Sequence, residues 1–265
     1  MNHLLSRKEQ YFYGPAIPLL NSENWNPDLH PRNSIGEFIY TDGGLHGRSP
    51  SGRGGSNPMV KGSEGFQIAR QFIIEQEVSD RKYYDSHETY PTIPGGGTPG
   101  NKSGITIAIG YDLGQVSPAQ FESDWGDLLD KETMARLRPY VGKSALPQSA
   151  LAPLSGIKIP WDAATKEFEE RTLPKTIQDT RAIYPQLDDL PPESQAALVS
   201  LVYNRGTNLK KMPTMVKIQE DLQAGNLKKI PEDFYAMINI QKALGPRRQR
   251  EGDLFAKGLA RISQK

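Results

Sequence analysis

Two different hydrophobic spacings follow one another within residues 66–114, and together they constrain the fold more than any other feature of the chain. The first segment has an apolar residue at the three- and four-residue steps of one helix face: Phe66, Ala69 and Ile73. The second has isoleucine at every other position, which is typical of a strand: Ile105, Ile107 and Ile109. The stretch therefore predicts a helix that runs into a Gly-rich β-hairpin.

One carboxylate falls on the apolar face of the predicted helix. Glu77 follows Ile73 by one turn on the same face, whereas Glu75 projects to the other side. Partial burial and the negative end of the helix dipole both disfavour a charged carboxylate, so we expect a raised pKa and a Glu77 able to donate a proton near neutral pH. The alternative is a purely structural glutamate paired with a nearby cation: Arg70, Arg81 or Lys82.

The predicted strand has small or polar residues between its isoleucines: Thr106, Ala108 and Gly110. We expect the isoleucine face to be buried and the other face to leave room for a ligand close to the backbone. A helix that ends in an acid beside such a hairpin is an arrangement that indicates an active site.

Three segments, in order, resemble the phage-type lysozymes of glycoside hydrolase family 24. The pattern of that family is a Glu at a helix end, an Asp about nine residues later and then Thr-Ile-Gly-x-Gly-His, and Glu77, Asp85 and residues 106–110 follow it approximately. Residues 195–206 resemble the Gln-x-x-Ala-Leu-Val-Ser-Phe-x-Phe-Asn-x-Gly helix of the family. Residues 244–255 resemble its terminal Gly-Leu-x-x-Arg-Arg-x-x-Glu-x-x-Leu-Phe segment.

The resemblance implies an α+β fold with a mostly helical lobe, a small β-hairpin lobe and a cleft between them. It also implies hydrolysis of the β-1,4 bond between N-acetylmuramic acid and N-acetylglucosamine in peptidoglycan, with two carboxylates at work. Glu77 would be the general acid and Thr106 would help to hold the attacking water. Asp85 is the nearest match for the second carboxylate, Asp112 could supply it instead, and Asp80 is a weaker candidate.

The resemblance further implies substrate contacts. Tyr111 stands where the family has His, and it is predicted to bind substrate together with Gly110. Asn204 is predicted either to face the substrate from the end of its helix or only to cap that helix. Arg247 and Arg248 are expected to be surface or helix-cap charges, the alternative being a contact with peptide-stem carboxylates.

Other functions stay open at this level. A lytic transglycosylase needs only the glutamate and yields an anhydro sugar, and a chitinase differs only in its substrate. A wall-binding module would keep the fold without the chemistry.

Composition excludes several classes of function. A net charge of +1 gives no electrostatic footprint for nucleic acid, and the absence of Cys removes thiolate metal sites and thiol nucleophiles. The four scattered His residues form no zinc motif, so we expect neither a metal nor a cofactor.

The expected location follows from the lack of targeting signals. No apolar run has the length of a signal peptide or a membrane span. We therefore expect synthesis in the cytoplasm and action in the periplasm or cell wall of a target bacterium, as an antibacterial effector or an endolysin. The expected partners are a peptidoglycan glycan strand, a secretion component and an immunity protein.

The distribution of Gly, Ser and Pro along the chain predicts the domain organisation. Residues 1–61 are expected to be an irregular arm with a linker, and residues 62–265 the catalytic domain. Gly-rich residues 95–103 predict a hairpin tip or a loop over the substrate groove. Later segments predict helices at 118–130, 131–140, 161–183 with an interruption at Pro174, and 192–203, the last being the buried central helix.

Overall fold

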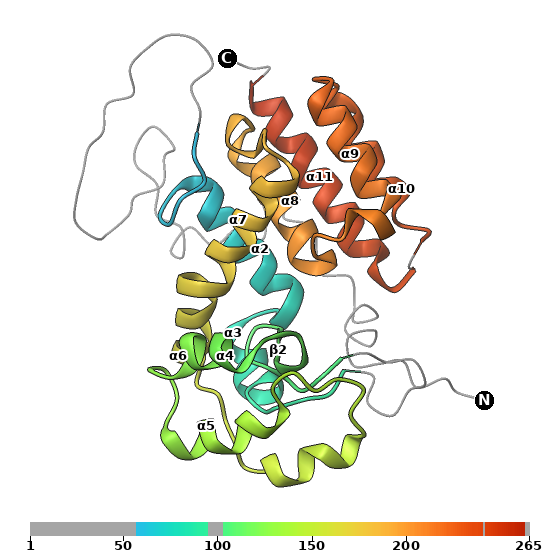
Figure 1. Cartoon of the computed structure of the whole chain (residues 1–265). Helices are drawn as coiled ribbons and strands as arrows, with labels where there is room; N and C mark the ends of the chain where they lie inside the picture. Colours follow the sequence, from blue (N-terminus) through green and yellow to red (C-terminus); the bar gives the residue numbers. More distant parts are fainter. Residues whose placement is uncertain (1–56, 95–102, 241, 263–265) are drawn as a thin grey trace. The chain divides into compact units, whose positions relative to one another are not determined.

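The computed structural model describes residues 57–94, 103–240 and 242–262, and this part of the chain is mostly helical (Figure 1). The predicted arm falls almost wholly outside it, as does most of the Gly-rich loop at 95–103. The helices are α2 (Glu64–Val78), α3 (Arg81–Tyr83), α4 (Pro118–Trp125), α5 (Lys131–Leu137), α6 (Trp161–Glu167), α7 (Leu173–Ile183), α8 (Pro192–Arg205), α9 (Pro213–Gln223), α10 (Ile230–Ala236) and α11 (Gly245–Ile262). The described residues contain one sheet, formed by the antiparallel strands β1 (Thr106–Ile107) and β2 (Tyr111–Asp112). The predicted α+β lysozyme-like fold is confirmed.

The core is built around α8, as its sequence predicts. Residues 192–202 of this helix are all buried, and most of their side chains are apolar or small. Both α2 and α11 pack against α8. The N-terminal helix with the candidate acid and the C-terminal helix thus share one central support.

Helix α2 meets the core through the predicted stripe. Phe66, Ala69 and Ile73 are each at most 1% exposed. The helix begins at a capping serine, because Ser63 accepts a hydrogen bond from the backbone N–H of Phe66. The stripe that predicted the helix is therefore also the surface that fixes it on α8.

Two predicted helices differ in their bounds. Helix α4 begins after Ser117, whose hydroxyl accepts from the N–H of Gln120 as expected, but it ends at Trp125 rather than at 130. Asp130 is instead the N-cap of α5, where it accepts from the N–H of Thr133. The helical stretch over 161–183 changes to a π-helical turn at Phe168–Thr172, before Pro174, and Pro174 is the second residue of α7.

The hairpin is shorter and more enclosed than predicted. Only two residues on each strand pair, Thr106 with Asp112 and Ile107 with Tyr111. The isoleucine face is buried, but Thr106 is 8% exposed and Ala108 is 4% exposed. The expectation of one open, small-residue face is therefore wrong, since other segments cover both faces. At the edge of β1, Thr92 exchanges two backbone hydrogen bonds with Thr106.

The packed body begins before the predicted boundary at residue 62. Met59 is 1% exposed, and its backbone N–H donates to the carboxylate of Asp188. The side-chain amide of Gln195 donates to the carbonyl of Asn57. Residues 57–61 are therefore part of the folded unit. No described helix combines the length and the apolar character that crossing a membrane requires.

Candidate active site

Glu77 lies in the last turn of α2 with only 8% of its side chain exposed. Glu75 lies on a more open side of the helix, where it forms an ion pair with Arg250 at 3.1 Å. Immediately after Glu77 the chain turns sharply, because Ser79 adopts a positive φ of 62°. Glu77 is thus the more buried of the two carboxylates near the end of α2, and its role as the acid stays a prediction.

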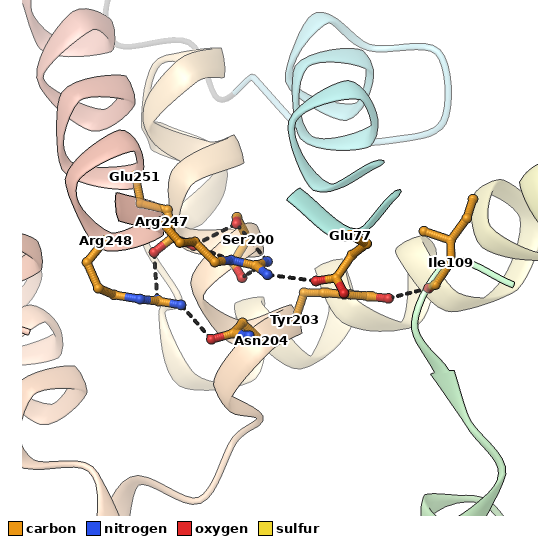
Figure 2. Close-up of polar contacts among 8 residues, drawn as sticks. All are labelled: Glu77, Ile109, Ser200, Tyr203, Asn204, Arg247, Arg248 and Glu251. Carbon is orange, nitrogen blue, oxygen red and sulfur yellow. Dashed lines mark hydrogen bonds and ion pairs between the residues drawn. The ribbon is translucent and has the colours of Figure 1, made fainter. Parts of the chain in front are cut away.

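The partner of Glu77 comes from the far end of the sequence. Nη1 of Arg247 on α11 lies 2.6 Å from Oε1 of Glu77 (Figure 2). Arg70, one of the cations expected to pair with Glu77, pairs with Glu169 instead. The guanidinium of Arg247 therefore places a buried positive charge directly beside the carboxylate of Glu77.

Arg247 belongs to a buried network of charges. Its Nε lies 3.2 Å from Glu251, which also accepts a hydrogen bond from the Ser200 hydroxyl at 2.7 Å. Arg248 lies 2.6 Å from the other oxygen of Glu251 and donates to the side-chain oxygen of Asn204 (Figure 2). The two arginines are 2% and 1% exposed, so the expectation that they are surface or helix-cap charges is wrong.

Burial and pairing act differently on the two arginines. Burial lowers the pKa of Arg248 to about 10, and the charge of Glu251 compensates only partly. Burial also lowers the pKa of Arg247, but Glu77 and Glu251 outweigh it and leave that pKa above its ordinary value. Arg247 is thus a permanent cation that holds the carboxylate of Glu77 in one orientation. The amide oxygen of Asn204 is engaged by Arg248, so the predicted contact of Asn204 with substrate stays a prediction.

The tip of the hairpin rests against the acid. Gly110 has a φ of 71°, and a Cβ built on it would lie 3.1 Å from Oε2 of Glu77 and 2.8 Å from the hydroxyl of Tyr203. The Tyr203 hydroxyl donates to the carbonyl of Ile109 at 2.6 Å. A residue with a side chain would both clash and be strained here, so glycine allows the backbone to approach the carboxylate.

The hairpin places Thr106 and Asp112 side by side. They are directly opposite partners in the two-stranded ladder, so their side chains lie on the same face, with Cβ atoms about 5 Å apart. Oδ1 of Asp112 accepts backbone N–H groups from Gly104 at 3.0 Å and Gly114 at 2.8 Å. These two bonds stabilise a charged carboxylate and fix its position.

The other two carboxylate candidates lie in a different environment. Asp85 is exposed in the π-helical turn Tyr84–Glu88, with Arg81 at 3.5 Å as its ion-pair partner. Asp80 is the N-cap of α3, where its side chain accepts from the N–H of Tyr83 at 2.7 Å. Among the three aspartates, Asp112 is therefore the one that pairs across the hairpin with Thr106.

Tyr111 faces the opposite side of the hairpin from Asp112. It is 7% exposed, its ring packs edge-to-face on Trp125, and its hydroxyl donates to Asp124 at 2.7 Å. Burial, followed by the hydrogen bond to Asp124, raises the pKa of Tyr111 well above its ordinary range. Tyr111 anchors the hairpin to α4, and this placement lends no support to the prediction that it binds substrate.

A further carboxylate, not singled out from the sequence, is buried at the end of α6. Glu167 is 2% exposed and accepts a hydrogen bond from the Thr172 hydroxyl at 2.6 Å. Burial raises its pKa from the ordinary value of 4.5 to about 8, although the Thr172 hydrogen bond acts in the opposite direction. Glu167 is therefore protonated in the folded protein at neutral pH.

The Glu167→Gln variant is expected to gain stability relative to wild type as the pH rises. In the unfolded chain Glu167 ionises with a pKa near 4.5, whereas in the folded protein its pKa is about 8. The contribution of neutral Glu167 to stability is therefore fully present below pH 4.5 and is lost as the pH rises to about 8. Between about pH 5 and about pH 6.5 the difference in unfolding free energy should change by about 2 kcal/mol in favour of Gln. Urea unfolding of both proteins at several pH values measures it, and a difference that does not vary with pH would contradict the burial of a neutral Glu167.

The described residues contain no group of three or more His, Cys, Asp and Glu side chains that could hold a metal ion.

No curated protein matches the chain. The Pesticin family model, described as "Bacterial toxin homologue of phage lysozyme, C-term", matches residues 67–224, which is more than half of the chain. The matched segment includes Glu77, Thr106 and Asp112, and the match confirms the resemblance to phage-type lysozymes. The chain belongs to the Pesticin family of bacterial toxin homologues of phage lysozyme.

Proposed function

We propose that the protein is a muramidase that hydrolyses the β-1,4 bond between N-acetylmuramic acid and N-acetylglucosamine in peptidoglycan glycan strands. The observation that carries the proposal is the seating of the hairpin against Glu77. The hairpin touches the acid at Gly110 and carries Thr106 and Asp112 as a cross-strand pair. Two carboxylates are the groups that glycoside hydrolysis ordinarily requires, and here they lie on two elements in contact, with the hydroxyl of Thr106 beside the second.

Each group has a defined role in this proposal. Glu77 protonates the glycosidic oxygen as the bond breaks, and the Arg247 ion pair fixes the direction in which its carboxyl group points. Two backbone N–H groups hold the carboxylate of Asp112 in place, and together with Thr106 it positions water. One carboxyl group that donates a proton and a second carboxylate in different surroundings is the division of roles known for glycosidases.

The two leading candidates for the second carboxylate can be separated by parallel substitutions. Asp112→Asn is expected to slow peptidoglycan hydrolysis about 100-fold, because the amide can neither activate water nor stabilise positive charge on the sugar. Asp85→Asn is expected to stay within about threefold of wild type, because Asp85 is exposed and its pair with Arg81 is weak. The measurement is the initial rate of turbidity loss of a peptidoglycan suspension. The reverse ranking would make Asp85 the second carboxylate.

The Asn substitution at 112 also removes a charged acceptor from the base of the hairpin, so the folding of Asp112→Asn must be checked. Thermal unfolding supplies the check. If Asp112→Asn melts at a lower temperature than wild type but is still folded at the assay temperature, the comparison of its rate with that of Asp85→Asn remains valid. Asp112→Glu, which keeps the charge but displaces it, is expected to lie between the two rates.

The membership in a toxin family supports a proposed role against bacteria. In this role the enzyme acts in the periplasm or cell wall of a target cell, after transfer by a secretion component. A toxin of this kind calls for an immunity protein in the producing cell. Co-expression of a candidate immunity protein, followed by the turbidity assay, would test that partner.

The defining experiment is digestion of purified peptidoglycan and mass analysis of the released sugars. Muropeptides with reducing ends are the expected result. Anhydro products, lighter by one water molecule, would replace the proposal with a lytic transglycosylase. If the folded protein bound the wall but released no sugars, the proposal would be replaced by a wall-binding module.

A further inference from the structure

Tyr203 lies between the acid and the tip of the hairpin. It belongs to the last turns of α8, and its side chain extends past Glu77 to reach the carbonyl of Ile109 (Figure 2). The hydrogen bond to that carbonyl is 2.6 Å long. The next residue, Gly110, is the one whose Cα faces both the Tyr203 hydroxyl and Oε2 of Glu77.

The hairpin depends on such outside anchors. Two paired residues on each strand do not make a stable hairpin by themselves. Its connecting loop also contains a non-glycine residue in the left-handed region, Ala108, with a φ of 51°. A conformation of this kind persists only where the surroundings impose it. Asp112 holds the base of the hairpin, Tyr111 joins one face to α4, and Tyr203 holds the tip.

The raised pKa of the Tyr203 hydroxyl suits a group that always donates a hydrogen bond. Burial, followed by the charges that Glu77 and Glu167 carry once they are ionised at high pH, raises the pKa of this phenol well above its ordinary value. The hydroxyl therefore keeps its proton at neutral pH. The ring is fixed from the other side, because Phe168 packs against it edge-to-face with centroids 5.9 Å apart.

We propose that Tyr203 is a positioning residue that holds the hairpin tip, and with it Thr106 and Asp112, at a working distance from Glu77. This inference rests on the proposed function for its effect on catalysis. Tyr203 acts through the hairpin and does not need to touch the sugar. Loss of its hydroxyl lets the tip move away from the acid, so the two sides of the reaction lose alignment, to which rates are highly sensitive.

The experiment compares Tyr203→Phe with Tyr184→Phe. Both substitutions remove one tyrosine hydroxyl that donates to a backbone carbonyl and keep the ring. Tyr184 donates to Met215, which links the end of α7 to α9 and not to the hairpin. For Tyr203→Phe we expect kcat on soluble glycan fragments to fall roughly tenfold with KM nearly unchanged. For Tyr184→Phe we expect kcat and KM close to wild type.

Amide hydrogen exchange across residues 106–112 provides a second readout that does not depend on activity. Exchange there should accelerate several-fold in Tyr203→Phe and stay at the wild-type rate in Tyr184→Phe. Unchanged exchange in Tyr203→Phe would contradict the proposal that Tyr203 holds the hairpin tip. Faster exchange with an unchanged kcat would overturn the positioning role. If the wild type released no sugar, the proposed function would be contradicted instead. Hydrogen exchange would still show whether Tyr203 holds the hairpin tip.

Discussion

Replacing Glu77 with Gln is expected to lower the release of muropeptides about 1000-fold while the protein remains folded. General acid catalysis contributes roughly two to four orders of magnitude, and an amide cannot supply a proton to the leaving oxygen. Gln keeps the size of Glu and retains an oxygen that can accept from Arg247, so the contact between α2 and α11 survives in weaker form. The loss should therefore appear in kcat and not in folding.

The matched control is Glu75→Gln, which makes the same chemical change two residues earlier on the same helix. Glu75 accepts from Gln71 and pairs with Arg250 on a partly exposed side of α2. Its substitution should change the rate by less than about twofold, because such pairs contribute little. Near-ultraviolet circular dichroism establishes that both variants are folded. A folded Glu77→Gln with more than about a tenth of the wild-type rate would remove Glu77 from the role of general acid.

Local spacing was sufficient to predict the parts of the fold that depend on neighbouring residues. The stripe from Phe66 to Ile73 predicted α2 and the inward position of Glu77, and the apolar run of α8 predicted the central helix. Capping chemistry located the start of α4 at Ser117. These features are set by residues three or four positions apart, which a sequence displays directly.

The parts that were missed depend on residues far apart in the chain. Arg247 lies 170 residues after Glu77, and no periodic pattern connects the two. Charged residues in a terminal helix ordinarily lie in solvent, so nothing local marked Arg247 and Arg248 as buried. The one available signal was Glu251, four residues after Arg247 and three after Arg248, a spacing that places all three side chains on one face.

The hairpin shows a similar division between local and distant information. Alternating isoleucines predicted the strand, yet Thr106 and Ala108 are covered by segments that the alternation cannot reveal. The pairing register of Thr106 with Asp112 is also a product of the fold. That register is the reason to prefer Asp112, although Asp85 has the closer sequence spacing to Glu77.

The charged network behind Glu77 should make a large contribution to stability. The Glu251→Gln substitution is expected to lower the free energy of unfolding by about 4 kcal/mol. Glu251 is fully buried and is the shared partner of Arg247, Arg248 and Ser200. Its neutralisation leaves two buried guanidinium groups with Glu77 as the remaining carboxylate of the network. Urea unfolding at neutral pH measures the loss.

The control for this loss is a solvent-exposed ion pair. Lys175 and Asp179 on α7 lie 2.6 Å apart, but their side chains are 61% and 38% exposed. Asp179→Asn should therefore change the unfolding free energy by less than about 0.5 kcal/mol. Equal losses in Glu251→Gln and Asp179→Asn would show that the buried network stabilises the protein no more than a surface pair does.

A double substitution separates the loss of a partner from the general disturbance of the core. In a Glu251→Gln background, Arg248→Met removes one of the two poorly compensated cations and fills its space with an apolar side chain. If unpaired buried charge causes the instability, the double variant should regain about 2 kcal/mol, even though it has lost one more polar contact. If disturbed packing causes it, the second substitution should add to the loss. Recovery would establish that the charge balance among Glu77, Arg247, Arg248 and Glu251 holds α11 in place beside the proposed catalytic acid.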